Sequence, residues 1–177
     1  MLVPNVRMLD KTSENVSENY AEYLTGLGQK LSSKFEVKIL SHCEEDMTLA
    51  EQISDSLGLS NNQILHHRDP RIVKGIIGSA AVVVGSRYHA LQAALSQGIV
   101  AFALGWSHKY PDLFKSYSWS QGILDPLADA EMAYQYVVEH SGAKRESICR
   151  VLQERSELLK QETIAMWDEI FEFLGSR

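Results

Sequence analysis

The chain has 177 residues, of which 45% are apolar and 23% are charged, and this is the composition of an ordinary globular domain. Its 17 basic and 23 acidic residues give a formal net charge of −6, which argues against a general nucleic-acid or anionic-membrane surface, because both need a positive field. A few local cations can still hold a small anion in an acidic protein.

Apolar runs of strand length alternate along the chain with segments of helical spacing. The expected strands are Leu2–Leu9, Phe35–Leu40, Gln63–His66, Ala80–Val84 and Ile99–Leu104. The first helical stripe consists of Val16, Tyr20, Tyr23, Leu24, Leu27 and Leu31. A stripe with this spacing predicts an amphipathic helix between the first two strands.

Capping residues mark the next two helices. Asp46 or Thr48 is expected to cap a helix whose apolar members include Leu49, Ile53 and Leu57. The pair Asp69-Pro70 predicts another helix start, with aspartate as N-cap and proline at its preferred first position. The buried side of that helix is predicted to be Ile72, Ile76 and Ile77.

Beyond Leu104 the pattern loosens into a loop and a short helix over residues 105–119. A short final strand is expected at Gly122–Asp125, and the chain becomes helical again from Asp129. The stretch Lys144–Leu174 carries a broad apolar stripe with helical spacing, which predicts a long carboxyl-terminal helical segment.

The runs AAVVV and IVAFAL do not alternate with polar residues. A strand that is apolar on both faces is buried on both faces, as in a parallel sheet covered by helices. We therefore predict an α/β fold, a Rossmann-like doubly wound parallel sheet flanked by helices, whose strand order the sequence leaves open.

The segment after the fourth expected strand is the strongest candidate site. Gly85 allows a tight turn, Ser86 and Arg87 follow, and a helix over Tyr88–Ser96 is expected to begin at once. A helix amino terminus attracts phosphate or carboxylate, and a guanidinium can hold either group with two hydrogen bonds. His89 lies in the first helical turn, where an imidazole facing a bound anion would carry a proton.

A plainer interpretation of this turn is equally compatible with the spacing. In it, Ser86 is simply the helix N-cap, Arg87 is a surface residue and His89 is a hydrogen-bonded, partly buried histidine.

A second candidate follows the fifth expected strand, where Lys109 would bring a mobile ammonium group to the same edge of the sheet. If the strands that precede Arg87 and Lys109 are neighbours, the two cations converge on one pocket. The alternative is an exposed lysine in a loop, with Trp106 as a packing anchor.

Weaker candidates lie elsewhere. His66-His67 could border the same cleft, although such a pair is more often structural or solvated. The run Glu44-Glu45-Asp46 resembles a metal site, yet acidic residues before a helix need no metal. Asp125 before Pro126 is expected to be a turn residue. No P-loop, dinucleotide fingerprint, nucleophile elbow or zinc spacing is present, so we expect neither a metal nor a cofactor.

The compartment follows from the cysteines and the amino terminus. Cys43 and Cys149 lie far apart and match no metal-ligand spacing, so reduced thiols of a cytoplasmic protein are expected. The sequence MLVPNVRMLD has no apolar core of a secretory signal, and no window approaches the roughly 20 apolar residues of a membrane span. We expect a soluble protein without a transmembrane segment.

The segment VVVGSRYHALQAALSQGIVAFALGWSHKYPDLF, residues 82–114, resembles the segment by which polysaccharide pyruvyl transferases are recognised. Its features are an apolar strand, Ser-Arg-x-His, a helix of small residues, a second strand and a lysine in the following loop. Weaker similarity extends over residues 2–126, through DPRIVKGIIGSA back to VPNVRMLD. Val100 stands where many members have proline, a mild departure that leaves the chemistry unaffected.

The resemblance implies a transferase with two Rossmann-like halves, as in GT-B glycosyltransferases. Such enzymes transfer the enolpyruvyl carbons of phosphoenolpyruvate onto two hydroxyls of a sugar, as a ketal, in the biosynthesis of cell-surface polysaccharide (exopolysaccharide). Carried over to this chain, Ser86, Arg87 and the backbone around Tyr88 would bind the donor. His89 would be the catalytic general acid that protonates the methylene carbon, and Lys109 would be a second cation.

Members of this family are about twice as long as this chain, and their amino-terminal half supplies the acceptor site and a further basic contact. We therefore expect residues 1–177 to be a single domain that resembles the carboxyl-terminal, donor-binding half. Its expected partners are phosphoenolpyruvate, a sugar or polysaccharide-precursor acceptor and an absent amino-terminal domain.

Two alternatives stay open. One is a GT-B-type glycosyltransferase donor domain for a nucleotide sugar, although the sequence places no acidic residue convincingly for the ribose. The other is a non-catalytic interaction module, against which the presence of Arg87, His89 and Lys109 together counts.

Overall fold

The computed structural model describes residues 1–105 and 107–175, and in these residues five parallel strands form one sheet in the order β3-β2-β1-β4-β5. The strands are β1 Leu2–Val3, β2 Ile39–Leu40, β3 Ile64–Leu65, β4 Val83–Gly85 and β5 Ala101–Ala103. The helices are α1 Glu14–Leu31, α2 Met47–Ser56, α3 Pro70–Gly78, α4 Tyr88–Leu95, α5 Lys109–Ser116, α6 Ala130–Ser141 and α7 Arg145–Gly175. The predicted α/β doubly wound fold with a long final helix is confirmed.

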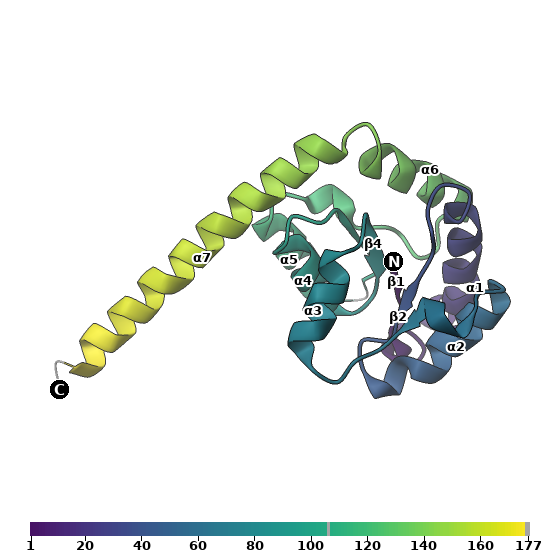
Figure 1. Ribbon diagram of the computed structural model, residues 1–177, viewed down its shortest axis with the longest axis horizontal. Helices are drawn as coiled ribbons and strands as arrows, with labels where there is room; N and C mark the ends of the chain where they lie inside the picture. The colour runs from purple at the N-terminus through teal and green to yellow at the C-terminus, as the bar shows by residue number, and fades with distance from the viewer. Residues whose placement is uncertain (106, 176–177) are drawn as a thin grey trace.

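The helices cover both faces of the sheet. Figure 1 shows α1, α2 and α6 on one side of the strands and α3, α4 and α5 on the other. The chain first builds outward from β1 to β3 and then crosses to β4 on the other side of β1. The segments that follow β1 and β4 therefore leave the sheet in opposite directions, and such a switch point is where open α/β sheets bind ligands.

The two continuous apolar runs form β4 and β5, and both strands are buried as expected. Val83, Val84 and Phe102 are fully or almost fully buried between the helical layers. Gly85 is needed for a reason other than the turn we predicted: a Cβ at this position would lie 2.6 Å from the carbonyl oxygen of Val3, on the neighbouring strand. The residue therefore permits close approach of β4 to β1.

All the predicted strands are shorter in the structure, and two of them differ most from the prediction. The run Leu2–Leu9 is a strand only at Leu2–Val3, because Pro4 has no N–H for the ladder and Asn5 begins the 3₁₀-helix η1, Val6–Met8, by accepting a hydrogen bond from the Arg7 N–H. The final strand predicted at Gly122–Asp125 is wrong in extent. Its place is taken by the 3₁₀-helix η4, Ser120–Gly122, and a single parallel bridge from Ile123 to β5.

The two predicted helix caps behave differently. Asp69 caps α3 as expected, since its Oδ1 accepts a hydrogen bond from the Arg71 N–H at 2.8 Å and proline follows it. Asp46 occupies the N-cap position of α2, but its carboxylate makes no cap hydrogen bond. Its side chain contacts other elements, described below.

The predicted buried face of α3 is partly wrong. Val73 and Ile77 are buried, four residues apart on one face, whereas Ile72 is 46% exposed and Ile76 is half-buried. Sequence hydrophobicity favoured the isoleucines, but the direction in which α3 faces the sheet is set by its packing against α4.

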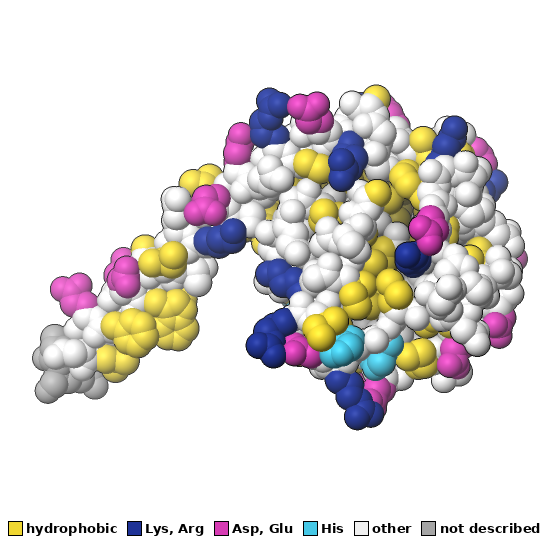
Figure 2. Space-filling model, in the orientation of Figure 1, with side chains coloured by type: hydrophobic (Ala, Val, Ile, Leu, Met, Phe, Trp, Pro, Cys, Tyr) yellow, Lys and Arg dark blue, Asp and Glu magenta, His cyan; other side chains and the backbone are white. Residues whose placement is uncertain are grey.

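The final helix α7 leaves the body of the protein. Its first half packs through Ile148 and Leu152, and the Ser156 hydroxyl donates to the Ser96 carbonyl oxygen at 2.9 Å. The second half projects away from the other helices (Figure 1) and carries large apolar side chains at its surface (Figure 2). These exposed side chains are Ile164, Met166, Trp167, Ile170, Phe171, Phe173 and Leu174.

Candidate functional site

The turn after β4 is fixed by bonds to three other elements. Ser86 is fully buried, and its carbonyl oxygen accepts hydrogen bonds at 2.7 Å from the Asn5 side-chain amide and at 2.7 Å from the Tyr110 hydroxyl. Its own hydroxyl accepts from Tyr20 at 2.9 Å. The donors come from the end of β1, from α5 and from α1, so the turn is held rigidly. A contact between Ser86 and a substrate stays a prediction.

Arg87 is held by a carboxylate that the sequence did not connect with it. Its Nε and Nη2 lie 2.5 Å and 2.6 Å from the two carboxylate oxygens of Asp46, whose side chain is fully buried. Asp46 also accepts from the Val6 N–H at 2.9 Å and from the Cys43 thiol at 3.3 Å. Burial disfavours the charged guanidinium, but the bond to Asp46 outweighs this and raises the pKa of Arg87.

This ion pair decides how Arg87 can meet a ligand. A guanidinium has five N–H donors, and Asp46 takes the edge formed by Nε and one hydrogen of Nη2. The remaining donors are the two hydrogens of Nη1 and the outer hydrogen of Nη2. An anion would therefore bind Arg87 end-on, through the edge opposite Nε, and the guanidinium would be preorientated by Asp46.

The next two residues begin helix α4. Arg87 occupies the N-cap position without a side-chain cap bond, so the alternative in which Ser86 is the N-cap is wrong. Tyr88 is half-buried and makes edge-to-face ring contacts with His89 and Tyr110, at centroid distances of 5.6 Å and 6.0 Å. His89 is exposed. Its imidazole is therefore accessible at the amino end of a helix, where an anion is favoured.

Lys109 reaches the same edge of the sheet. The strands that precede Arg87 and Lys109 are neighbours, because β4 pairs with β5 along its length. Lys109 is the exposed first residue of α5, and the next residue, Tyr110, bonds the Ser86 carbonyl oxygen. The sequence left open whether these two strands are neighbours, and the structure shows that they are. The proposed packing role of Trp106 lies outside the described residues.

Sequence reasoning missed His42, which follows β2 and is half-buried. Burial lowers the pKa of its imidazole most, electrostatic interactions with Arg87 and His89 lower it further, and Asp46 acts in the opposite direction. His42 thus lies close to Arg87 and His89. Only the strand order, which brings the end of β2 within one strand of β4, could have revealed it.

A family model described as polysaccharide pyruvyl transferase matches residues 7–108, which is more than half of the chain. The chain belongs to the polysaccharide pyruvyl transferase family. No curated protein matches it. The matched range contains Arg87, Tyr88 and His89 and ends one residue before Lys109. Membership implies a transferase that acts in polysaccharide modification.

The paired histidines of this family member serve the local backbone. The His66 Nδ1 lies 3.0 Å from the Ser41 carbonyl oxygen, which ties the end of β3 to the end of β2. The His67 Nδ1 accepts from the Asp69 N–H at 2.9 Å, next to the start of α3. The structural alternative for this pair thus has direct support.

The acidic run after β2 is occupied by arginines. Glu44 pairs with Arg68 at 2.9 Å, Glu45 lies 3.3 Å from Arg7, and Asp46 holds Arg87. In the described residues, no three His, Cys, Asp or Glu side chains are placed to hold a metal ion. No helix among the described residues is long and apolar enough to cross a membrane.

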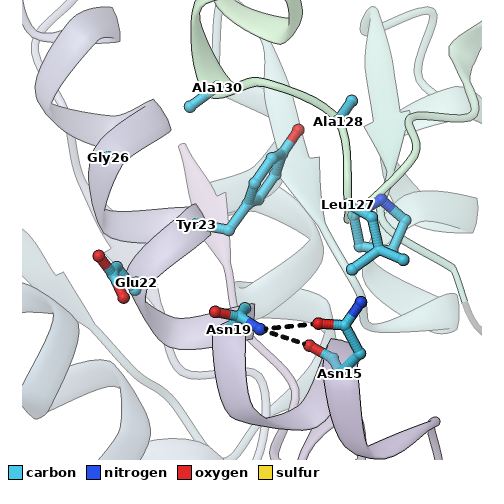
Figure 3. Close-up of a pocket in the computed structure, with 9 residues that line it drawn as sticks. Asn15, Asn19, Glu22, Tyr23, Gly26, Leu127, Ala128 and Ala130 are labelled. Atoms are coloured by element: carbon cyan, nitrogen blue, oxygen red, sulfur yellow. Dashed lines mark hydrogen bonds between the residues drawn. The ribbon is translucent and has the colours of Figure 1, made fainter.

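A separate hollow of about 510 Å³ lies between α1 and the loop before α6 (Figure 3). Tyr23 projects from α1 into its wall, and its buried hydroxyl has no hydrogen-bond partner among the described residues. Burial raises the pKa of Tyr23 to about 12, and the carboxylates of Asp125 and Asp129 add to the effect. Arg87 and Lys109 do not line this hollow.

The two tyrosines of α1 allow a matched test of the hydrogen bonds that hold the turn at Ser86. Tyr20→Phe is expected to lower the free energy of unfolding by about 1–2 kcal/mol, because the Ser86 hydroxyl loses its buried donor. Tyr23→Phe removes an unpartnered hydroxyl and is expected to change it by less than about 0.5 kcal/mol, or to raise it. Urea denaturation of both variants measures the difference, and equal losses would contradict it.

Proposed function

We propose that this chain is the donor-binding domain of a transferase that takes the pyruvyl group from phosphoenolpyruvate and places it on two hydroxyls of a sugar as a ketal. The observation that carries the proposal is that Arg87 and His89 follow β4, at the switch point, and Lys109 follows the neighbouring strand β5, in a member of this family. Phosphoenolpyruvate carries up to three negative charges, which this combination of cations and a helix amino terminus complements.

In this proposal, Arg87 binds the donor end-on while Asp46 holds the guanidinium from behind. The backbone N–H groups at the start of α4 and the ammonium of Lys109 neutralise the rest of the anion. Tyr88 packs against His89 and Tyr110 and so sets the position of the imidazole. Ser86 contributes chiefly by fixing the turn, since its hydroxyl and its carbonyl oxygen already have partners.

His89 is proposed as the general acid. It gives a proton to the methylene carbon of phosphoenolpyruvate, which becomes a methyl group and leaves C2 electron-poor. One sugar hydroxyl attacks C2 and its proton returns to His89, and a second hydroxyl then displaces the phosphate from C2, with the second hydroxyl proton leaving on the phosphate. The products are the pyruvate ketal and inorganic phosphate. The exposure of His89 supports this role, because the donor must reach the imidazole.

We further propose that the acceptor sugar is bound by a second, amino-terminal domain outside these 177 residues, and that the reaction belongs to the cytoplasmic stage of cell-surface polysaccharide synthesis. The exposed apolar side chains on the outer half of α7 support a further packing surface. A groove of about 890 Å³ between α4, α5 and α7 has Tyr88 in its lining.

A calorimetric titration tests the donor assignment. The chain is titrated with phosphoenolpyruvate and with UDP-sugars, as wild type and as Arg87→Lys. Lysine keeps a positive charge beside Asp46 but lacks the planar edge that binds an anion end-on. We expect phosphoenolpyruvate to bind the wild type, with affinity at least tenfold lower in Arg87→Lys, since charge-assisted hydrogen bonds to this anion are lost.

The same titration separates the alternatives. Preferential binding of a UDP-sugar would replace the proposal by a glycosyltransferase-like donor domain. Binding of neither ligand to the folded chain would favour a non-catalytic interaction module. Circular dichroism of Arg87→Lys serves as the folding control.

A further inference from the structure

Two arginines from different strand ends point at one carboxylate oxygen. Glu45 Oε2 lies 3.3 Å from Nη2 of Arg7 and 4.0 Å from Nη2 of Arg87. Arg7 belongs to η1 after β1, Glu45 belongs to the 3₁₀-helix η2, Glu44–Asp46, after β2, and Arg87 follows β4. The three residues therefore meet at the switch point, although they are far apart in the sequence.

Each arginine has a carboxylate anchor of its own besides this shared one. The Arg7 Nη1 donates to Asp10 at 3.0 Å, and Arg87 is bound by the buried Asp46. The buried Asp46 fixes the Arg87 guanidinium, whereas the Arg7–Asp10 pair is exposed. The Nη2 of each arginine lies near the same Glu45 oxygen, and the Nη2 of Arg87 also donates to Asp46. Two guanidinium groups thus converge on one carboxylate oxygen, whereas an ordinary surface ion pair has one donor group for each carboxylate.

Glu45 differs from Asp46 in how firmly it is held. The Glu45 side chain is 61% exposed, whereas that of Asp46 is fully buried. An exposed ion pair contributes little to stability and exchanges readily with solvent or with another anion. Asp46 is therefore a fixed part of the site, and Glu45 is a carboxylate that a stronger ligand can displace.

We propose that Arg7 is a second cationic contact for the carboxylate of the donor, and that Glu45 occupies this position when the donor is absent. The proposal rests on the proposed function, because it names the group of phosphoenolpyruvate that binds between Arg7 and Arg87. A ligand carboxylate replaces a protein carboxylate of the same charge and shape. Glu45 thus lowers the apparent affinity for the donor by competing with it.

The chain supplies matched controls one residue away. Glu44 stands beside Glu45, is similarly exposed and pairs with Arg68 at 2.9 Å instead of with Arg7 or Arg87. Glu44→Gln and Glu45→Gln therefore change the net charge equally, and so do Arg68→Gln and Arg7→Gln. Any difference within a matched pair reports the position of the charge rather than the overall field of the protein.

The experiment is a calorimetric titration of phosphoenolpyruvate into the wild type and these four variants. Arg7→Gln is expected to weaken binding about tenfold, the usual scale of one charge-assisted hydrogen bond. Glu45→Gln is expected to strengthen binding about threefold, because the competing carboxylate is gone. Arg68→Gln and Glu44→Gln are expected to stay within about twofold of the wild type, since their pair is exposed.

Competition with pyruvate and with inorganic phosphate identifies the donor group. If Arg7 binds the carboxylate, Arg7→Gln weakens competition by pyruvate and leaves competition by phosphate unchanged. The reverse pattern would assign the phosphate to Arg7 and overturn the carboxylate assignment. If Glu44→Gln and Glu45→Gln raise the affinity for phosphoenolpyruvate equally, the increase comes from the net charge of the protein. That result would overturn the proposed competition by Glu45.

The two proposals fail in distinguishable ways. If phosphoenolpyruvate binds the wild type and Arg87→Lys weakens binding at least tenfold, but Arg7→Gln and Glu45→Gln have no effect, only the role of Arg7 is refuted. If phosphoenolpyruvate binds none of the proteins, the donor assignment itself is refuted, and the role of Arg7 is refuted with it.

Discussion

Replacement of Arg87 by methionine is expected to lower the free energy of unfolding by about 3–5 kcal/mol, the range found when one partner of a buried ion pair is removed. Asp46 is fully buried and would lose two hydrogen bonds at 2.5 Å and 2.6 Å, and among the described residues the Val6 N–H and the Cys43 thiol are the donors left to it. Methionine replaces the alkyl stem, so the loss reports the charge. Urea denaturation of the variant measures it.

A double variant provides the control. In Arg87→Met with Asp46→Asn the buried charge is absent, and the asparagine oxygen can still accept from the Val6 N–H. We expect the double variant to regain most of the stability lost in Arg87→Met, because the cost lies in the uncompensated carboxylate. If Arg87→Met is as stable as the wild type, or if the double variant is less stable than the single one, Asp46 is not the residue that requires Arg87.

Replacement of His89 by alanine is expected to lower the rate of pyruvyl transfer about 10²–10⁴-fold, the usual contribution of a positioned general acid. The affinity for phosphoenolpyruvate is expected to change by only a few-fold, since Arg87 and Lys109 remain. His89 is exposed, so the substitution removes little packing from the fold. The measurement is phosphate release from phosphoenolpyruvate in the presence of a sugar acceptor, alongside a binding titration.

His67→Gln is the matched histidine control, because His67 is also exposed and also follows a strand at this edge of the sheet. Its ring contacts only the local backbone through the Asp69 N–H in the described structure, so turnover is expected to stay near the wild-type rate. A wild-type turnover rate in His89→Ala would exclude His89 as the general acid. An equal loss of turnover in both variants would indicate a general disturbance of this edge of the sheet.

The local features of this protein could be read from its sequence. The alternation of strands and helices, the helix start at Asp69-Pro70 and the turn Ser86–His89 each depend on neighbouring residues. Helix and strand propensities, caps and hydrophobic periods act over this range. The fold class and the place of the main candidate site therefore followed from the sequence.

The partner of Arg87 did not follow from the sequence. Asp46 is 41 residues away, and the two meet because β2 and β4 both flank β1. Strand order is set by tertiary packing, so the sequence offered Asp46 as a helix cap or as part of an acidic run, but not as the partner of Arg87. The same reason hid His42 and the approach of Arg7 to Arg87. The sequence predicted an anion site in which the Arg87 guanidinium is free. In the structure, Asp46 already binds one edge of that guanidinium.

The second half of α7, residues 160–175, is not expected to unfold cooperatively with the rest of the protein. An isolated helix of about 15 residues is only marginally stable in water, because nucleation is costly and each added hydrogen bond contributes little. Residues 160–175 bury almost no surface against the body, so their helix–coil equilibrium is separate from the unfolding of the sheet. A surface that covered Trp167 and Phe171 would order this helix in the same step, and its affinity would be lower than the apolar area alone suggests.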